Sequence, residues 1–284
     1  MEILQYDFMQ RALMAALLVG LAAPLVGVFL VQRRLALIGD GIGHVALTGV
    51  ALGLLTGRAP VLVALVVSII GAVTVEVMRT RGRTGGDLAL AIMFYGGIAG
   101  GVVLIQWAPG GTAATLNSYL FGAITTTSGA DLVVFGGLAL VVVLITTFLS
   151  RQLFAVSNDE EFARASGMPV TALNIVLACL TASTVVISMR VVGLLLISAL
   201  MIVPVATAQL VTRSFRSTGL LAVGVGVICS LAGVVASFYA NTPSGGSIVL
   251  LAIGVFVLTA VAAAIARSVR RRASRPQLHE DISI

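Results

Sequence analysis

Long apolar stretches separated by short polar breaks run along most of this chain. Each stretch holds about 18 to 24 residues, the length that an α-helix needs to cross the hydrocarbon core of a bilayer. Several breaks contain arginine, glycine or proline. The pattern predicts about nine membrane-spanning helices, over residues 8–31, 33–55, 59–78, 88–107, 132–149, 170–189, 191–211, 220–238 and 248–266.

One segment is too polar for a simple span and too apolar for a plain loop. It covers residues 108–130, and its apolar middle, residues 115–124, is shorter than a span. Irregular backbone at membrane depth is tolerated where other protein covers it. We therefore expect a short or re-entrant helix there, on the outer side of the membrane.

The composition supports a membrane protein. Of the 284 residues, 59% are hydrophobic and 10% are charged, whereas a soluble domain has about 25% charged residues. The 31 glycines favour close packing of helices in lipid. The sequence therefore predicts an all-α polytopic membrane protein, with a single transmembrane domain over residues 1–267 and a basic cytoplasmic tail over residues 268–284.

The basic residues exclude one class of protein and indicate an orientation. All 17 are arginine, so the chain lacks the lysine of a phosphate-binding loop and is not a P-loop ATPase. They lie in short clusters between apolar stretches, which membrane orientation explains better than nucleic-acid binding does. We expect the N-terminus outside and the C-terminus in the cytoplasm. The clusters predicted to be cytoplasmic are Arg33 with Arg34, Arg79 with Arg81 and Arg83, Arg151 with Arg164, Arg213 with Arg216, and the tail.

The stretch over residues 33–55 carries an acid and a histidine, Asp40 and His44, four residues apart. On a helix, such residues share a face with their Cβ atoms about 5–6 Å apart, so both side chains can bind one divalent cation. Ionisable groups inside membrane segments usually face an interior or a pathway. The alternative is a pair that only fixes helix packing, with protonated His44 as the partner of the Asp40 carboxylate.

Glycines surround this pair. Gly39, Gly41 and Gly43 flank the acid, and we expect them to loosen or break the start of the helix. Gly49 and Gly53 lie four residues apart further along. They predict a face on which another helix can pack closely.

The polar segment over residues 150–169 carries the signals of a helix of its own. Ser157 followed by Glu160 matches a capping box, and the acids at 159–161 suit the first turn of a helix. Gly167 followed by Pro169 is typical of a helix end. The pattern predicts a short helix over residues 157–167, between two spans.

The GDGIGH motif in an apolar span, the short capped helix and the glycine-rich helical core together make the chain similar to a known family. It resembles the membrane permease subunit of bacterial zinc/manganese ABC importers along essentially its whole length. The motifs that carry the resemblance are FMQRAL (8–13), VQRRLALIGDGIGHVALTGVALG (31–53), SYLFG (118–122), DEEFARASGMP (159–169) and VVGLLLISALMIVPVATA (191–208).

The resemblance implies the compact fold of ABC importers related to the vitamin B12 permease, in the bacterial inner membrane. It implies three protein partners: a cytoplasmic ATPase subunit, an extracytoplasmic metal-binding protein and a second permease copy that completes a homodimer in membrane lipid. The chain would be a transport subunit and not an enzyme. Its cargo would be a divalent metal, zinc, manganese or iron, with no permanently bound cofactor.

The resemblance also implies roles for particular residues. The family's intramembrane metal ligands fall on Asp40 and His44. The helix over residues 157–167 would be the coupling helix that seats in the ATPase subunit. The residues expected to couple to the ATPase are Asp159, Glu160, Glu161, Ala163 and Gly167.

Three further residues, Glu76, Ser198 and Pro204, are candidates for the transport pathway. For Glu76 we favour an interfacial ion pair with Arg79, three residues later. Two other functions remain open. A permease for iron-siderophores, haem or cobalamin would not need the acid–histidine pair, and a proton-coupled secondary transporter would not need a docking helix.

Overall fold

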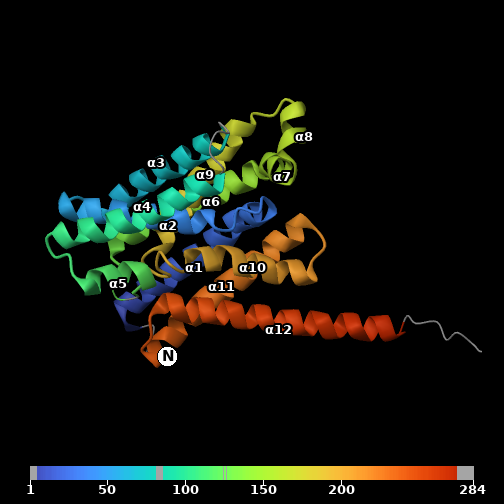
Figure 1. Ribbon diagram of the computed structural model, residues 1–284. Helices are drawn as coiled ribbons and strands as arrows, with labels where there is room; N and C mark the ends of the chain where they lie inside the picture. The colour runs from blue at the N-terminus through green and yellow to red at the C-terminus, as the bar shows by residue number, and fades with distance from the viewer. Residues whose placement is uncertain (1–4, 81–85, 124, 126, 274–284) are drawn as a thin grey trace, which may run out of the picture.

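The structure is a computed structural model that describes residues 5–80, 86–123, 125 and 127–273. Within these residues the chain forms twelve α-helices and no strand (Figure 1), in agreement with the predicted all-α class. In chain order they are α1 (Asp7–Gln32), α2 (Ile38–Leu55), α3 (Pro60–Thr80), α4 (Gly86–Trp107), α5 (Ala113–Phe121), α6 (Gly129–Phe148), α7 (Ser150–Asn158), α8 (Glu160–Ala165), α9 (Val170–Ser188), α10 (Ile197–Val211), α11 (Phe215–Ala240) and α12 (Ser244–Ala273).

Most of these helices have the length and composition of membrane spans. In the described part of the chain, eight helices are long and apolar enough to cross a membrane, and α10 is apolar but has only 15 residues. This agrees with the prediction of a multi-pass membrane protein with about nine spans. The last helix, α12, continues to Ala273, so no helix end marks the predicted boundary at residue 267.

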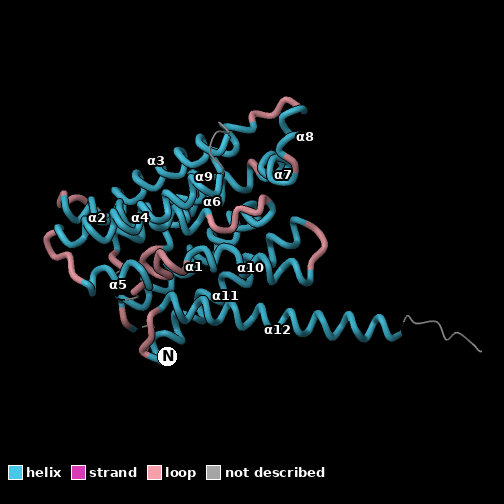
Figure 2. Tube along the Cα trace, in the orientation of Figure 1, coloured by secondary structure: helices cyan, strands magenta, loops and turns pink. Residues whose placement is uncertain are grey.

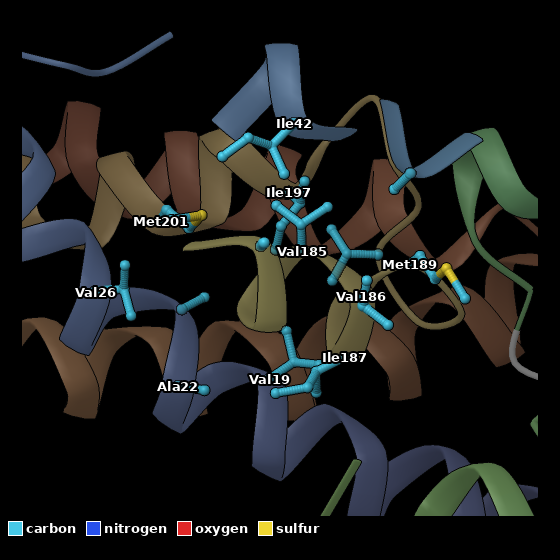
Figure 3. Packing of buried hydrophobic residues seen from close by; sticks show 14 of the residues in the cluster. Val19, Ala22, Val26, Ile42, Val185, Val186, Ile187, Met189, Ile197 and Met201 are labelled. Atoms are coloured by element: carbon cyan, nitrogen blue, oxygen red, sulfur yellow. The ribbon is translucent and has the colours of Figure 1, made fainter. Parts of the chain in front are cut away.

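Helices α1 and α9 form the centre of the bundle. Every residue of α9 from Leu180 to Ser188 is buried, and α1 buries most of its length. Side chains from α1, α2, α9 and α10 meet in this core, as Figure 3 shows for Val19, Val26, Ile42, Val186, Ile187, Ile197 and Met201. In lipid, such small and branched side chains hold helices together by close van der Waals packing.

Glycines bring α2 close to α3, as predicted. A Cβ atom on Gly49 would lie 2.6 Å from Ala64 Cα, and one on Gly53 would lie 2.6 Å from Pro60 Cα. Real Cβ atoms do not approach backbone so closely, so only glycine fits at either position. The predicted packing face of α2 is confirmed.

The prediction of a loosened or broken start to α2 is wrong. Gly39, Gly41 and Gly43 all lie inside the regular helix that begins at Ile38. They are buried, and they make room for neighbours: a Cβ atom on Gly41 would lie 2.5 Å from Leu90 Cδ1 of α4. These glycines therefore serve packing around the acid.

The polar segment before α6 contains the predicted short helix, α5, at Ala113–Phe121. Its end is bound to the loop that precedes α10: Leu194 N donates to Tyr119 O over 2.9 Å, and Ala123 N donates to Arg190 O over 3.0 Å. Figure 2 shows loop segments close to α5 in this part of the molecule. The pairing holds residues 190–196 outside a regular helix, which is why α10 begins later than the predicted span did.

Candidate functional site

Asp40 and His44 lie one turn apart on the same side of α2. Asp40 is the third residue of the helix, where free backbone N–H groups carry partial positive charge and favour a carboxylate. Asp40 is partly buried, and His44 is only 3% exposed. Both side chains therefore lie inside the protein, on one face of one helix.

The direct partner of Asp40 is Ser198, in the first turn of α10. The Ser198 hydroxyl donates a hydrogen bond to Asp40 Oδ1 over 2.5 Å. The starts of α2 and α10 thus meet at this carboxylate, and the partial positive charge of a helix start stabilises an anion. The described ion pairs do not include Asp40, so His44 does not lie at ion-pair distance from it, and a protonated His44 as the partner of Asp40 stays a prediction.

His44 packs between α2 and α4. The ring of Phe94 meets the imidazole edge-on, with 4.3 Å between the ring centroids and 77° between the planes. Gly97 lets α4 approach, since a Cβ atom there would lie 2.6 Å from the carbonyl carbon of His44. His44 Nδ1 is buried with no hydrogen-bond partner among the described residues. Such an unpaired atom costs about 1–3 kcal/mol, and it leaves a nitrogen lone pair or N–H group free to bind a ligand.

The site thus offers a carboxylate, an imidazole nitrogen and a hydroxyl. These donors fit a divalent transition metal. The described residues contain no group of three or more histidine, cysteine or acidic side chains that could enclose an ion. A metal at Asp40 and His44 would keep free coordination positions, which suits an ion in transit better than a stored one.

The other pathway candidates lie differently. Glu76 is 2% exposed and accepts two hydrogen bonds from Arg79, over 2.8 and 3.1 Å. This is the ion pair that the sequence favours. Pro204 is buried inside α10, where its ring removes the helix bond to the carbonyl of Leu200. Of the three candidates, the structure brings Ser198 to Asp40.

The polar segment after α6 folds into two short helices, and the second begins later than predicted. Asp159 precedes α8 and caps it by accepting a hydrogen bond from Phe162 N over 2.9 Å. The predicted capping box of Ser157 and Glu160 is wrong, because Ser157 is buried in the last turn of α7. The predicted end is confirmed: Gly167 follows α8 with φ of 78°, the left-handed conformation that glycine adopts freely.

The residues of α8 face in two directions. Ala163 is fully buried in the core of this chain, so its predicted place on a contact face is wrong. Glu161 is exposed, and Phe162 is 68% exposed. Sequence reasoning missed Phe162, although an aromatic residue inside a polar segment was an available signal.

The arrangement of Asp40 and His44 on a glycine-lined helix, with a short capped helix at one end of the bundle, can be compared with known proteins. The sequence pattern that defines the ABC 3 transport family matches residues 5–263. The chain belongs to the ABC 3 transport family. It is therefore a permease subunit of an ABC transporter and not an enzyme, and a permease of this family works with ATPase and substrate-binding partners.

Relatives of this ABC 3 chain match along nearly their whole length. It is 35% identical over 257 residues to the manganese transport system membrane protein MntC of Halalkalibacterium halodurans, covering 90% of this chain and 88% of the relative. It is 31% identical over 267 residues to the manganese import system permease protein ScaB of Streptococcus gordonii, covering 94% and 95%.

Solved structures share the fold of this ABC 3 permease. PsaBC from Streptococcus pneumoniae in complex with Fab superposes with a TM-score of 0.82 and 32% identity, over 90% of this chain and 92% of that one. An inward-facing putative metal-chelate type ABC transporter superposes with a TM-score of 0.71 over 89% and 86%, at 20% identity, a likeness in fold alone. The resemblance stated from the sequence motifs is confirmed at the level of family and fold.

Two contacts at these sites have no signal in the sequence. Ser198 is 158 positions from Asp40, and no helical or turn spacing relates positions so far apart. The same holds for Arg33, whose guanidinium reaches Glu160 of α8 over 3.0 Å. Only the packing of α1, α2, α8 and α10 brings these residues together.

Proposed function

We propose that this chain is the permease subunit that carries manganese(II) through the membrane, with Asp40 and His44 as ligands of the ion in transit. The observation that carries the proposal is the hydrogen bond between the Ser198 hydroxyl and the Asp40 carboxylate at the starts of α2 and α10, with the unpaired His44 imidazole one helical turn from Asp40 on the same side of α2. The names of the relatives, MntC and ScaB, supply manganese as the ion.

The donor set favours manganese over a softer metal. Carboxylate, hydroxyl and water oxygens suit Mn²⁺, whereas thiolate and thioether ligands select softer ions. Zinc is the competing cargo, because a carboxylate and an imidazole bind it as well. Water or a second copy of the chain would complete the coordination, and incomplete coordination by protein lets the ion leave.

The proposed orientation places the α8 end of the bundle in the cytoplasm. Arg33, Arg79 and Arg164 come from three of the predicted cytoplasmic clusters, and all three reach the carboxylate of Glu160. Figure 1 places α8 and the end of α12 on the side of the bundle away from α5. Basic residues concentrate on the cytoplasmic side, where α8 would dock onto the ATPase of a homodimeric bacterial inner-membrane importer.

The test is manganese uptake by the permease reconstituted with its ATPase and binding protein in lipid vesicles. Asp40→Asn removes the charge and His44→Ala removes the nitrogen ligand, so we expect each to reduce uptake to the level of vesicles without ATP. Both variants should still co-purify with the ATPase subunit, because neither residue lies on α8. Uptake at the wild-type rate in both variants would contradict the proposal and reduce the pair to a packing contact.

A further inference from the structure

The side chain of Glu160 connects α8 to the longer helices of the bundle. Its Oε2 accepts a hydrogen bond from Arg33 over 3.0 Å and lies 3.5 Å from Arg79. Its Oε1 accepts from Arg164 over 3.2 Å and from Asn174 over 3.5 Å. The four partners come from the end of α1, from α3, from α8 itself and from α9. A single carboxylate therefore connects the short helix to three longer ones.

This contact is partly shielded from water. Arg33 is 6% exposed at its side chain and Glu160 is 31% exposed, while Glu76, which binds Arg79 from the other side, is buried. Burial lowers the pKa of the Arg33 guanidinium, and the neighbouring Arg79 adds to this, while Glu76 and Glu160 oppose it. The carboxylates of Glu76 and Glu160 thus balance the positive charges of Arg33 and Arg79. Removing either acid would leave an excess of positive charge that is partly buried.

The route from Arg33 to the metal site is short and stiff. Arg33 is the C-cap residue that follows α1, and Asp40 lies seven positions later, in the first turn of α2. The turn between them is held by backbone hydrogen bonds, including Leu35 N to Leu30 O over 2.9 Å. Arg34 has φ of 58°, a strained conformation for a residue with a Cβ atom. Only six residues separate Arg33 from Asp40, so we expect a displacement of Arg33 to reach the start of α2.

A second contact supports the same connection. Gln32, the last residue of α1, donates to Asn158 Oδ1 over 3.1 Å, and Asn158 is the last residue of α7. The end of α1 is thus bound both to the residue before the α8 cap and to the first residue of α8. Glu161, the next residue along, is exposed and belongs to none of the described ion pairs.

We propose that Glu160 is a positioning residue that faces the membrane helices and, through Arg33, transmits movement of the ATPase-docked helix α8 to the start of α2, where Asp40 lies. The proposal rests on the proposed function, in which α8 docks onto the ATPase subunit. It divides the acids at 159–161 by role. Asp159 caps the helix, Glu160 forms ion pairs with Arg33 and Arg79, and Glu161 is exposed on the surface.

The experiment is a double-mutant cycle in the reconstituted permease–ATPase complex with its binding protein. Glu160→Gln, Arg33→Gln and the double variant are compared by manganese imported per ATP hydrolysed. We expect each single variant to lower this ratio at least fivefold while ATP hydrolysis continues and the ATPase remains bound. The double variant should be no worse than the poorer single variant, because both remove the same contact.

The matched control is the same cycle with Glu161→Gln in place of Glu160→Gln. Since Glu161 does not contact Arg33 among the described ion pairs, the effects of Glu161→Gln and Arg33→Gln should multiply. Multiplying effects in the Glu160 cycle, or a wild-type ratio in either Glu160→Gln or Arg33→Gln, would overturn the inference. If Glu160→Gln is not recovered folded, Arg33→Gln, which leaves α8 unaltered, decides alone. A wild-type complex that imports no manganese would contradict the proposed function instead.

Discussion

Two carboxylates near the ends of membrane helices are stabilised in different ways. Glu160 lies within 3.5 Å of three guanidinium groups. Asp40 has the hydroxyl of Ser198 and the starts of two helices, and no described ion pair. An acid compensated by arginines resists a metal ion, because a divalent cation would be repelled by them. An acid stabilised only by dipoles and a hydroxyl keeps its affinity for a cation.

This difference indicates a structural role for Glu160 and a metal-binding role for Asp40. Around Glu160, the charges of Arg33, Arg79, Arg164 and Glu76 all belong to described ion pairs, so this cluster can connect helices without binding an ion. In the Asp40 region, His44 Nδ1 has no described hydrogen-bond partner, and the described side-chain hydrogen bond to the Asp40 carboxylate comes from Ser198. Both groups therefore remain available to coordinate a metal ion. Perturbing the helix that carries Glu160 should therefore disturb folding and docking, whereas perturbing the hydroxyl that holds Asp40 should disturb metal binding.

The largest effect is expected on α8, where two alanines two positions apart face opposite surroundings. Ala163 is fully buried in the core, and Ala165 is exposed. Ala163→Arg would bury a charge without a partner, which costs several kcal/mol, so we expect little folded permease. Ala165→Arg should fold normally and reduce the amount of ATPase that co-purifies.

Size-exclusion chromatography in detergent, with the ATPase co-expressed, distinguishes the two variants. A monodisperse permease peak for Ala165→Arg with less ATPase bound, and aggregation for Ala163→Arg, is the expected result. A well-folded Ala163→Arg permease would show that α8 does not pack as described. Full recovery of the ATPase with Ala165→Arg would place the docking surface elsewhere.

A smaller effect is expected when the Asp40 hydrogen bond is removed. Ser198→Ala deletes the hydroxyl that orients the carboxylate, and losing such a supporting contact weakens metal affinity about 10-fold or more. Titration of manganese followed by the electron paramagnetic resonance signal of the free ion measures the change. Ser230→Ala, which removes another buried hydroxyl on α11, is the control and should leave affinity unchanged.

The direction of the Ser198 effect is informative in itself. We expect weaker manganese binding in Ser198→Ala, because the hydroxyl holds Asp40 in the orientation that faces the site. Tighter binding in this variant would mean that the hydroxyl competes with the ion for the carboxylate.

The sequence predicted the features that depend on neighbours along the chain. The apolar stretches indicated the spans, the polar composition of residues 108–130 predicted α5, and Gly167 predicted the end of α8. The placement of Asp40 and His44 on one face followed from helical spacing alone. Each of these depends on residues that are close together along the chain.

The predictions that were wrong, and the contacts that the sequence did not reveal, depend on tertiary packing. Ser157 matched a capping box in sequence, but α7 buries it, and Asp159 caps the next helix instead. The glycines around Asp40 suggested a broken helix, whereas α4 packs against them closely. The partners of both acids, Ser198 and Arg33, are more than a hundred positions away.

Whether manganese in transit binds the nitrogen of His44 can be measured directly. The chain has two histidines, His44 and His279, so a permease without an affinity tag offers one candidate ligand and one built-in control. Pulsed electron paramagnetic resonance of the manganese-loaded permease detects the hyperfine coupling of a directly bound imidazole nitrogen. We predict this coupling in the wild type and in His279→Gln, and its disappearance in His44→Gln. Nitrogen coupling that persists in His44→Gln would contradict the central claim.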